Sequence, residues 1–252
     1  MTVGSLFAGI GGIELGLEST GEFKVVWQVE NDPFANRVLE KHWPDVVRWD
    51  DVRTFPPNDE GWNIDVLSAG FPCQDISVAG KGIGLEGNQS GLFFEVMRIA
   101  QAVRPKFILL ENVSALLVRG LDEVLRSLAE IGFDAQWDCI PASAVGAPHR
   151  RDRIFIVAYS ESVGIQRLRK SKKQISSAYA RPKIPLRGST RERRHLWQVE
   201  PRVGRVVNGF PKKLDRGKRI KALGNAVVPQ VAELIGWSIL EWQEVIDSKK
   251  RI

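Results

Sequence analysis

The chain has 252 residues, of which 43% are hydrophobic and 26% charged, and its 36 Lys and Arg against 30 Asp and Glu give a net charge of +6. This composition is typical of a globular protein and excludes a disordered chain, a collagen-like repeat and a coiled-coil rod. No run approaches 18 consecutive apolar residues and no basic stretch precedes an apolar one near the start, so we expect neither a membrane span nor a secretory signal.

Predicted strands and helices alternate along the first 160 residues. Strand-like apolar segments cover residues 2–8, 23–29, 46–49, 64–68, 107–110, 134–140 and 154–159. Helical spacing covers residues 13–18, 33–42, 92–103, 121–131 and 227–246. This alternation predicts an α/β fold with a mostly parallel sheet and helices on both faces. We therefore assign residues 1–160, with a C-terminal return over 220–252, to one domain and residues 161–219 to a small basic region.

The charge is divided unevenly between these two parts. Residues 161–221 carry 19 Lys and Arg against 4 Asp and Glu, a net of +15, and the remaining 17 Lys and Arg against 26 Asp and Glu give −9. An acidic body with one strongly basic segment is typical of a globular protein with an arm that binds a polyanion. A solvated basic excursion of the surface is the alternative.

A glycine cluster, Phe7-Ala8-Gly9-Ile10-Gly11-Gly12, follows the first predicted strand. Glycines there let the backbone turn tightly and approach a ligand closely. Glu30 ends the second predicted strand, where nucleotide-binding sheets place a carboxylate that accepts hydrogen bonds from ribose hydroxyls. Together these features favour an adenosine-containing ligand, although the cluster alone is equally typical of a structural turn. Its Gly-x-Gly-Gly spacing does not match the Gly-x-Gly-x-x-Gly of dinucleotide-binding proteins, which disfavours NAD.

The two cysteines have different surroundings. Cys73 lies in Gly70-Phe71-Pro72-Cys73-Gln74, at the carboxyl end of a predicted strand, where open α/β sheets bind ligands. A glycine-rich stretch over residues 74–91 follows and has the length of a lid or binding loop. We interpret Cys73 as an exposed thiolate nucleophile and Cys139, in an apolar stretch, as a buried hydrophobic residue. Two cysteines predict neither a disulfide framework nor a metal site, and they favour a cytoplasmic location.

Glu111-Asn112-Val113 follows the apolar segment 107–110. Desolvation behind such a strand raises the pKa of a carboxyl group and suits it to donate a proton. A helix N-terminal cap made by Asn112 or Ser114 is the alternative.

Two further motifs lie later in the chain. Arg151 and Arg153 enter a predicted strand, and alternation would place both on one face, able to bind a phosphate or a base carbonyl. A structural ion pair with Glu111 is the alternative. Gly224-Asn225-Ala226-Val227-Val228-Pro229-Gln230 is expected to open the last helix, either as a cap or as a ligand loop.

Taken in order, the five motifs resemble the DNA (cytosine-5)-methyltransferase family. The glycine cluster is similar to its cofactor loop, Pro72-Cys73-Gln74 to its nucleophile motif, Glu111-Asn112-Val113 to its acidic motif, Arg151 and Arg153 to its arginine pair, and Gly224-Asn225 to its C-terminal cofactor motif. The resemblance covers residues 1–160 and about 200–240. It implies a Rossmann-like, S-adenosylmethionine-dependent methyltransferase sheet for the cofactor-binding and catalytic domain. The basic region takes the place of the target-recognition domain and is short, as in a phage- or prophage-like member.

The resemblance also implies a reaction and its residues. The catalytic residues would be Cys73, Glu111, Arg151 and Arg153. The Cys73 thiolate would attack C6 of a flipped cytosine, Glu111 would hydrogen-bond or protonate N3, and Arg153 would hold the base carbonyl with support from Arg151. S-adenosyl-L-methionine would then donate its methyl group to C5, and loss of the C5 proton would expel the cysteine.

The cofactor S-adenosyl-L-methionine would be bound by residues from all parts of the predicted domain. These are Phe7, Ala8, Gly9, Ile10, Gly12, Glu30, Asn31, Asp51, Val52, Gly70, Pro72, Leu92, Asn225 and Ala226. Three positions depart from the family pattern: Asn31 replaces a frequent aromatic or apolar residue, His149 a usual Gln, and Ala226 a frequent Ser.

Double-stranded DNA is the partner that the resemblance implies, bound by a monomer. The residues expected to contact it are Gln74, Ser77, Lys81, Arg187, Arg193 and Gln198. The sequence leaves open whether a cognate restriction endonuclease accompanies the protein in its host. The alternatives are transfer to cytosine in RNA, such as tRNA, a DNA-binding protein with a vestigial methyltransferase fold, and an NAD-dependent oxidoreductase.

Overall fold

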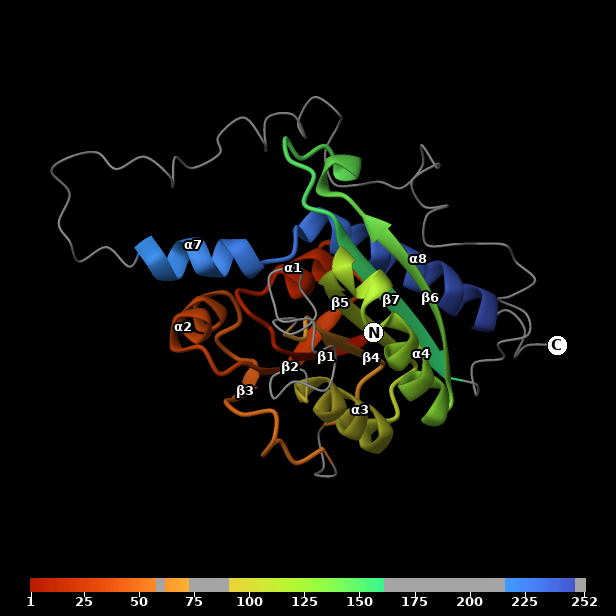
Figure 1. The fold of residues 1–252 in the computed structure, drawn as a ribbon. Helices are drawn as coiled ribbons and strands as arrows, with labels where there is room; N and C mark the ends of the chain where they lie inside the picture. Colours follow the sequence, from red (N-terminus) through yellow and green to blue (C-terminus); the bar gives the residue numbers. More distant parts are fainter. Residues whose placement is uncertain (58–61, 73–90, 161–215, 248–252) are drawn as a thin grey trace, which may run out of the picture.

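The computed structural model describes residues 1–57, 62–72, 91–160 and 216–247 (Figure 1). Within these ranges a seven-stranded sheet has the order β3-β2-β1-β4-β5-β7-β6. Its strands are β1 (Thr2–Leu6), β2 (Lys24–Val29), β3 (Val47–Trp49), β4 (Val66–Ala69), β5 (Phe107–Val113), β6 (Phe133–Ile140) and β7 (Arg153–Ser160). β1 to β5 pair in parallel, whereas β7 runs antiparallel to both β5 and β6. The predicted mostly parallel α/β sheet is confirmed.

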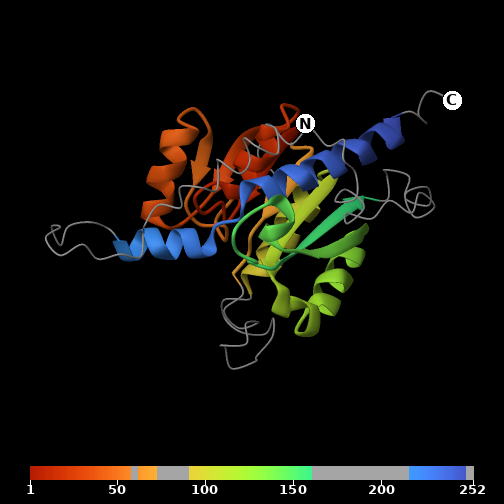
Figure 2. The same cartoon turned by 90° about the horizontal axis from the view of Figure 1, so that it is seen from above.

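Helices cover both faces of this sheet (Figure 2). They are α1 (Gly12–Ser19), α2 (Pro33–His42), α3 (Leu92–Val103), α4 (Leu121–Glu130), α7 (Arg216–Asn225) and α8 (Pro229–Asp247), with 3-10 turns η2 (Ser114–Val118) and η3 (Ala142–Val145). α1 and α8 pack on one face and α3 and α4 on the other. α2 begins where the sequence analysis expects, because the Asp32 side chain accepts hydrogen bonds from the Phe34 and Ala35 amides and Pro33 occupies the first turn.

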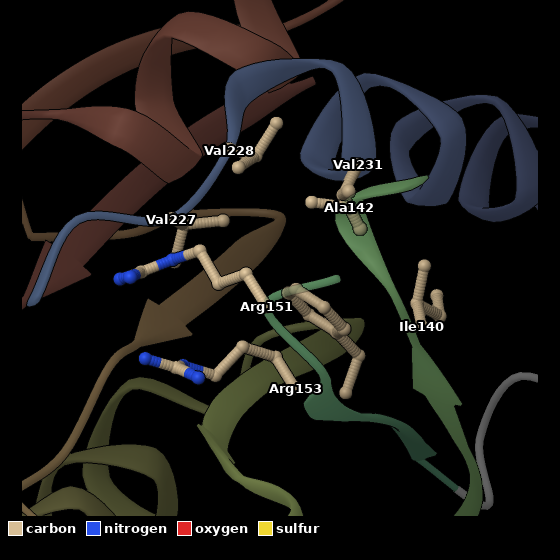
Figure 3. Close-up of a pocket in the computed structure, with 8 residues that line it drawn as sticks. Ile140, Ala142, Arg151, Arg153, Val227, Val228 and Val231 are labelled. Carbon is tan, nitrogen blue, oxygen red and sulfur yellow. The ribbon is translucent and has the colours of Figure 1, made fainter. Parts of the chain in front are cut away.

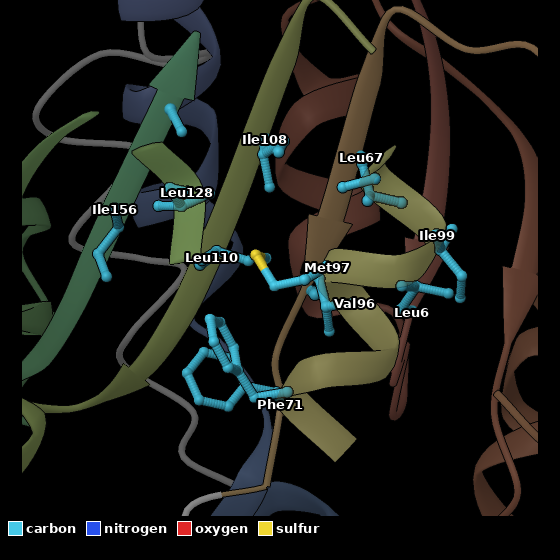
Figure 4. Packing of buried hydrophobic residues seen from close by; sticks show 14 of the residues in the cluster. Leu6, Leu67, Phe71, Val96, Met97, Ile99, Ile108, Leu110, Leu128 and Ile156 are labelled. Carbon is cyan, nitrogen blue, oxygen red and sulfur yellow. The ribbon is translucent and has the colours of Figure 1, made fainter. Parts of the chain in front are cut away.

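The central strand β5 shows why the sheet forms. Its first four residues, Phe107 to Leu110, are fully buried and supply the two faces in turn. Ile108 and Leu110 join the cluster under α3 and α4 (Figure 4), whereas Phe107 and Leu109 join the cluster under α1 and α8. A strand covered on both faces is apolar without interruption, which is typical of parallel sheets. Because β1 to β5 are parallel, their carboxyl ends lie at the same edge of the sheet.

Glycines allow α1 and α8 to approach each other closely. A β-carbon on Gly12 would lie 2.4 Å from the Val227 carbonyl oxygen, and one on Gly16 would lie 2.2 Å from the Pro229 carbonyl oxygen. Residues Lys221–Asp247 are long and apolar enough to cross a membrane by length and composition alone. Half of the 18-residue window in this segment that meets the test is buried inside the protein. Packing of α8 against α1 and the sheet accounts for this apolar character.

The C-terminal part differs from the sequence prediction. The segment 224–230 does open the last helix, since α8 begins at Pro229, two residues later than the helical spacing predicts. The cap reading of Gly224-Asn225 is wrong, because these two residues end α7. α7 is not predicted because it is polar and basic and shows no apolar stripe. A proline with its fixed φ and missing amide hydrogen suits a first helical position, which explains the later start of α8. Residues 161–215 lie outside the described ranges, so the division into domains stays a prediction.

Candidate active site

Glu111 lies inside β5, not after it, and faces an arginine from the neighbouring strand. The residue is only 7% exposed, and its Oε1 lies 3.0 Å from Nε of Arg153, the first residue of β7. Burial raises the pKa of Glu111 to about 7, although the nearby charges of Arg153 and Arg151 act in the opposite direction. The raised pKa predicted for Glu111 is confirmed. The ion pair with Glu111, predicted as the alternative role of the two arginines, is present for Arg153. A carboxyl group with this pKa is protonated in part of the molecules at neutral pH.

Asn112 connects β5 to the turn that precedes Cys73. Its Nδ2 donates a hydrogen bond to the Phe71 carbonyl oxygen at 3.2 Å, and its Oδ1 accepts one from the Val113 amide. The alternative of a helix cap is wrong, because the following 3-10 turn has no side-chain cap. The buried amide therefore holds Phe71, and with it the start of the Pro72 turn, against the strand that carries Glu111.

Arg151 and Arg153 line the same pocket, but only Arg153 belongs to the strand that was predicted to orient both side chains. Arg151 precedes β7 and has a φ of 40°, in the left-handed region, so strand alternation does not relate the two side chains. Arg151 Nη2 donates to the carbonyl oxygens of Gly224 at 2.6 Å and Ala226 at 2.5 Å. Figure 3 shows both guanidinium groups extending to the same side of the pocket, beside Val227.

The glycine cluster forms a tight turn with left-handed backbone at Phe7, Gly9 and Gly11. The Gly9 amide donates to Glu30 Oε2 at 2.7 Å, and the Asp32 amide donates to Glu30 Oε1 at 2.8 Å. The carboxylate at the end of β2 therefore holds both the turn and the start of α2. No atom lies within 4 Å of the position that a β-carbon on Gly9 would take, so the turn borders open space.

The other predicted cofactor residues differ in their exposure and in their partners. Asp51 is paired with Arg53 at 2.9 Å, Val52 is buried in the core cluster, and Leu92 begins α3. Asn225 is exposed at the end of α7. The remaining ones, all partly or fully exposed, are Phe7, Ala8, Ile10, Asn31, Gly70, Pro72 and Ala226. The contacts of these residues with a ligand stay predictions.

Several predicted site residues lie outside the described ranges. They are Cys73, Gln74, Ser77, Lys81, Arg187, Arg193 and Gln198. Cys139, in contrast, is described: it packs partly buried against the core, and burial together with Asp138 and Asp152 raises the pKa of its thiol. A thiol with a raised pKa is a poor nucleophile. The prediction that Cys139 is buried holds only in part, because its exposure is intermediate. In the described part of the chain, no group of His, Cys, Asp and Glu side chains is placed to hold a metal ion.

A further buried carboxyl group, that of Glu14, is not predicted from the sequence. It is fully buried on α1, accepts a hydrogen bond of 2.5 Å from the Ser5 hydroxyl, and has its pKa raised by burial to about 7. A glutamate in the first turn of a helix is ordinarily exposed, so the residue type gives no signal. The signal available was the spacing, since Ile13 and Leu17 are buried on the same side of the helix.

Residues 1–200 match the family model described as C-5 cytosine-specific DNA methylase. The chain is 38% identical over 154 residues to the Type II methyltransferase M.CviJI of Paramecium bursaria Chlorella virus IL3A, covering 61% of this chain and 41% of that protein. It is 37% identical over 162 residues to the Type II methyltransferase M.NgoBI of Neisseria gonorrhoeae, covering 63% and 50%. The chain spans about half the length of the curated relatives it matches.

Solved structures share the fold. The Dnmt2 methyltransferase of S. pombe matches with a TM-score of 0.59 at 18% identity, covering 73% of this chain and 56% of that one. A putative DNA modification methyltransferase encoded within an E. coli prophage matches with a TM-score of 0.52 at 24% identity, covering 65% and 47%. At these identities the likeness establishes the fold alone, which is the predicted Rossmann-like methyltransferase sheet.

Proposed function

Because this chain belongs to the family of C-5 cytosine-specific DNA methylases, we propose that it transfers a methyl group from S-adenosyl-L-methionine to C5 of cytosine in double-stranded DNA. The observation that supports this most strongly is the pair of Glu111 and Arg153, 3.0 Å apart and largely buried at the carboxyl end of β5. Asn112 joins this pair to the turn before Cys73. A proton donor and a cation thus lie beside the segment that leads to Cys73 in the sequence.

The glycine turn fits the proposed cofactor. Open space beside Gly9 leaves room for a ligand against the backbone, and Glu30 presents a carboxylate at the same place. Phe7, Gly9 and the neighbouring turn residues would hold the methionine part, and Glu30 the ribose. When bound, S-adenosyl-L-methionine supplies an electrophilic methyl group on its sulfonium sulfur.

The chain's own residues would make cytosine reactive. C5 of cytosine is a weak nucleophile, and addition of the Cys73 thiolate to C6 gives C5 the electron density of an enamine. Glu111 donates a proton or hydrogen bond to N3 as negative charge develops there, and Arg153 holds the base carbonyl oxygen. After methyl transfer, loss of the C5 proton restores the double bond and returns the electron pair of the C6–S bond to Cys73.

The raised pKa of Glu111 is central to this assignment. An ordinary glutamate is ionised at neutral pH and could only accept a hydrogen bond from a donor. With its pKa at about 7, Glu111 keeps a proton to share with N3. The adjacent guanidinium of Arg153 stabilises the carboxylate that forms once that proton has moved. The ion pair and the catalytic role are therefore compatible.

The target base would be reached by flipping it out of the duplex, because C5 and C6 are covered within the base stack. Residues 74–91 would close over the flipped base, and the basic region would contact phosphates. Phosphate contacts give affinity with little sequence information, so we expect a short or degenerate recognition sequence. Association with a cognate restriction endonuclease in the host is part of the proposal.

Methyl transfer can be measured directly. The protein is incubated with methyl-labelled S-adenosyl-L-methionine and, separately, duplex DNA and total RNA, and the products are identified by nucleoside mass spectrometry. We expect 5-methylcytosine in DNA and none with Cys73→Ala. Label in RNA alone would establish the RNA alternative, and no label in either polymer would support a vestigial fold.

A further inference from the structure

Arg151 and Arg153 lie two residues apart, yet they have different partners. Arg153 pairs with the carboxylate of Glu111. Arg151 donates instead to two main-chain carbonyls, those of Gly224 at 2.6 Å and Ala226 at 2.5 Å. These carbonyls flank Asn225 at the end of α7, about seventy residues further along the chain. Arg153 therefore binds the buried carboxyl group, whereas Arg151 binds the main chain of the C-terminal return.

The return is in close contact with the glycine turn on its other side. The Val227 carbonyl oxygen lies 2.4 Å from the position that a β-carbon on Gly12 would take. Val227 and Val228 also line the pocket that contains both arginines (Figure 3). Residues 224–228 thus contact Arg151 on one side and the start of α1, at Gly12, on the other.

An arginine is suited to this position. The last carbonyls of a helix have no partner within the helix and carry partial negative charge, which a cation stabilises. One guanidinium nitrogen reaches both carbonyls, and the charge strengthens both hydrogen bonds. The left-handed backbone of Arg151, which a non-glycine residue rarely adopts, directs the side chain toward the return rather than along β7.

We propose that Arg151 is a positioning residue that holds residues 224–228 against the glycine turn and thereby shapes the S-adenosyl-L-methionine pocket. This inference rests on the proposed function for the identity of the cofactor. Asn225, fixed between the two bonded carbonyls, is the side chain whose position depends most directly on Arg151. Arg153 acts on the base, and Arg151 acts on the cofactor through the return.

The test is calorimetric titration of the full chain with S-adenosyl-L-methionine. We expect Arg151→Ala to weaken binding by about tenfold or more, since two hydrogen bonds from a charged donor are lost. Arg151→Lys keeps the charge and can restore one bond, so its affinity should lie between the two. Arg150→Ala is the matched control, because this neighbouring arginine side chain is 84% exposed, and its affinity should stay within about twofold of wild type.

Two further readouts separate positioning from a general loss of structure. In steady-state assays the KM for S-adenosyl-L-methionine should rise by a larger factor than kcat falls. Hydrogen exchange over residues 222–230 should become faster in Arg151→Lys, even if Arg151→Ala does not fold. A wild-type protein that fails to bind S-adenosyl-L-methionine would show that the proposed cofactor is wrong. Binding by wild type and Arg151→Ala within twofold, or unchanged exchange in Arg151→Lys, would overturn the role of Arg151.

Discussion

Two of the buried glutamates, Glu14 on α1 and Glu111 on β5, have a pKa that burial raises to about 7. Glu14 lies under the glycine turn on α1, bonded to the Ser5 hydroxyl, and its Oε2 accepts no hydrogen bond from any described residue. Glu111 lies at the end of β5, paired with Arg153 and within the field of Arg151. Burial raises the pKa of both groups, but their neighbours differ.

The difference shows that a raised pKa does not by itself identify a catalytic group. Desolvation gives both carboxyls their pKa, and only Glu111 has a cation ready to stabilise the charge that appears when it gives up its proton. Glu14 has a hydroxyl donor, which is weaker compensation for a buried charge. We therefore assign proton donation to Glu111 and a structural role to Glu14.

The largest expected effect is on methyl transfer. Glu111→Gln keeps the size of the side chain but removes the transferable proton, and we expect kcat to fall by about 10² to 10⁴. Binding of S-adenosyl-L-methionine should stay within about twofold. The matched variant is Glu14→Gln, which should retain kcat within about threefold. Equal losses of kcat in the two variants would contradict the assignment.

The next effect is the dependence of stability on pH. Both carboxyls have a folded-state pKa above the ordinary glutamate value of 4.5, so the stability they contribute is complete below pH 4.5 and lost as pH rises through about 7. Each group accounts for up to about 3 kcal/mol of unfolding free energy across this window. Urea unfolding between pH 5 and 8 should show a falling stability in wild type. Glu14→Gln and Glu111→Gln should each reduce the slope, and an unchanged slope in Glu14→Gln would contradict its buried protonation.

The smallest effect concerns the contact that supports the glycine turn beside Glu14. Gly12→Ala would bring a β-carbon to 2.4 Å from the Val227 carbonyl oxygen, and we expect it to cost about 1 to 3 kcal/mol of stability and to weaken cofactor binding. Gly217→Ala is the matched control, because no atom lies within 4 Å of its β-carbon position in α7. The control should be neutral or slightly stabilising. Denaturant unfolding of both variants measures the difference.

Much of the fold is predictable from local pattern. The apolar segments and their alternation with helices locate the seven strands, because buried parallel strands and amphipathic helices have distinct periodicities. The raised pKa of Glu111 also follows from local sequence, since the segment before it is uniformly apolar. What is missed depends on contacts between distant segments. Glu14 is buried where α1 packs on the sheet, and its partner Ser5 lies in β1. The partners of Arg151 lie at the end of a basic helix without an apolar stripe and just after it.

The arginine pair illustrates the same limit. Strand alternation predicts that Arg151 and Arg153 act together on one face, and the pocket does contain both. The left-handed backbone at Arg151 and the start of β7 at Arg153 are tertiary features that alternation cannot anticipate. As a result, the main-chain partners of Arg151 could not be predicted from the sequence.

The central claim is that Cys73 attacks cytosine beside a protonated Glu111, and trapping the adduct tests it most directly. In duplex DNA whose cytosines carry fluorine at C5, no proton can leave after methyl transfer, so the C6–S bond should persist. Denaturing mass spectrometry of the digested complex should find nucleotide attached to the peptide containing Cys73 when S-adenosyl-L-methionine is present, and none in Cys73→Ala. Attachment at Cys139, or no attachment by a protein that methylates ordinary DNA, would contradict the account.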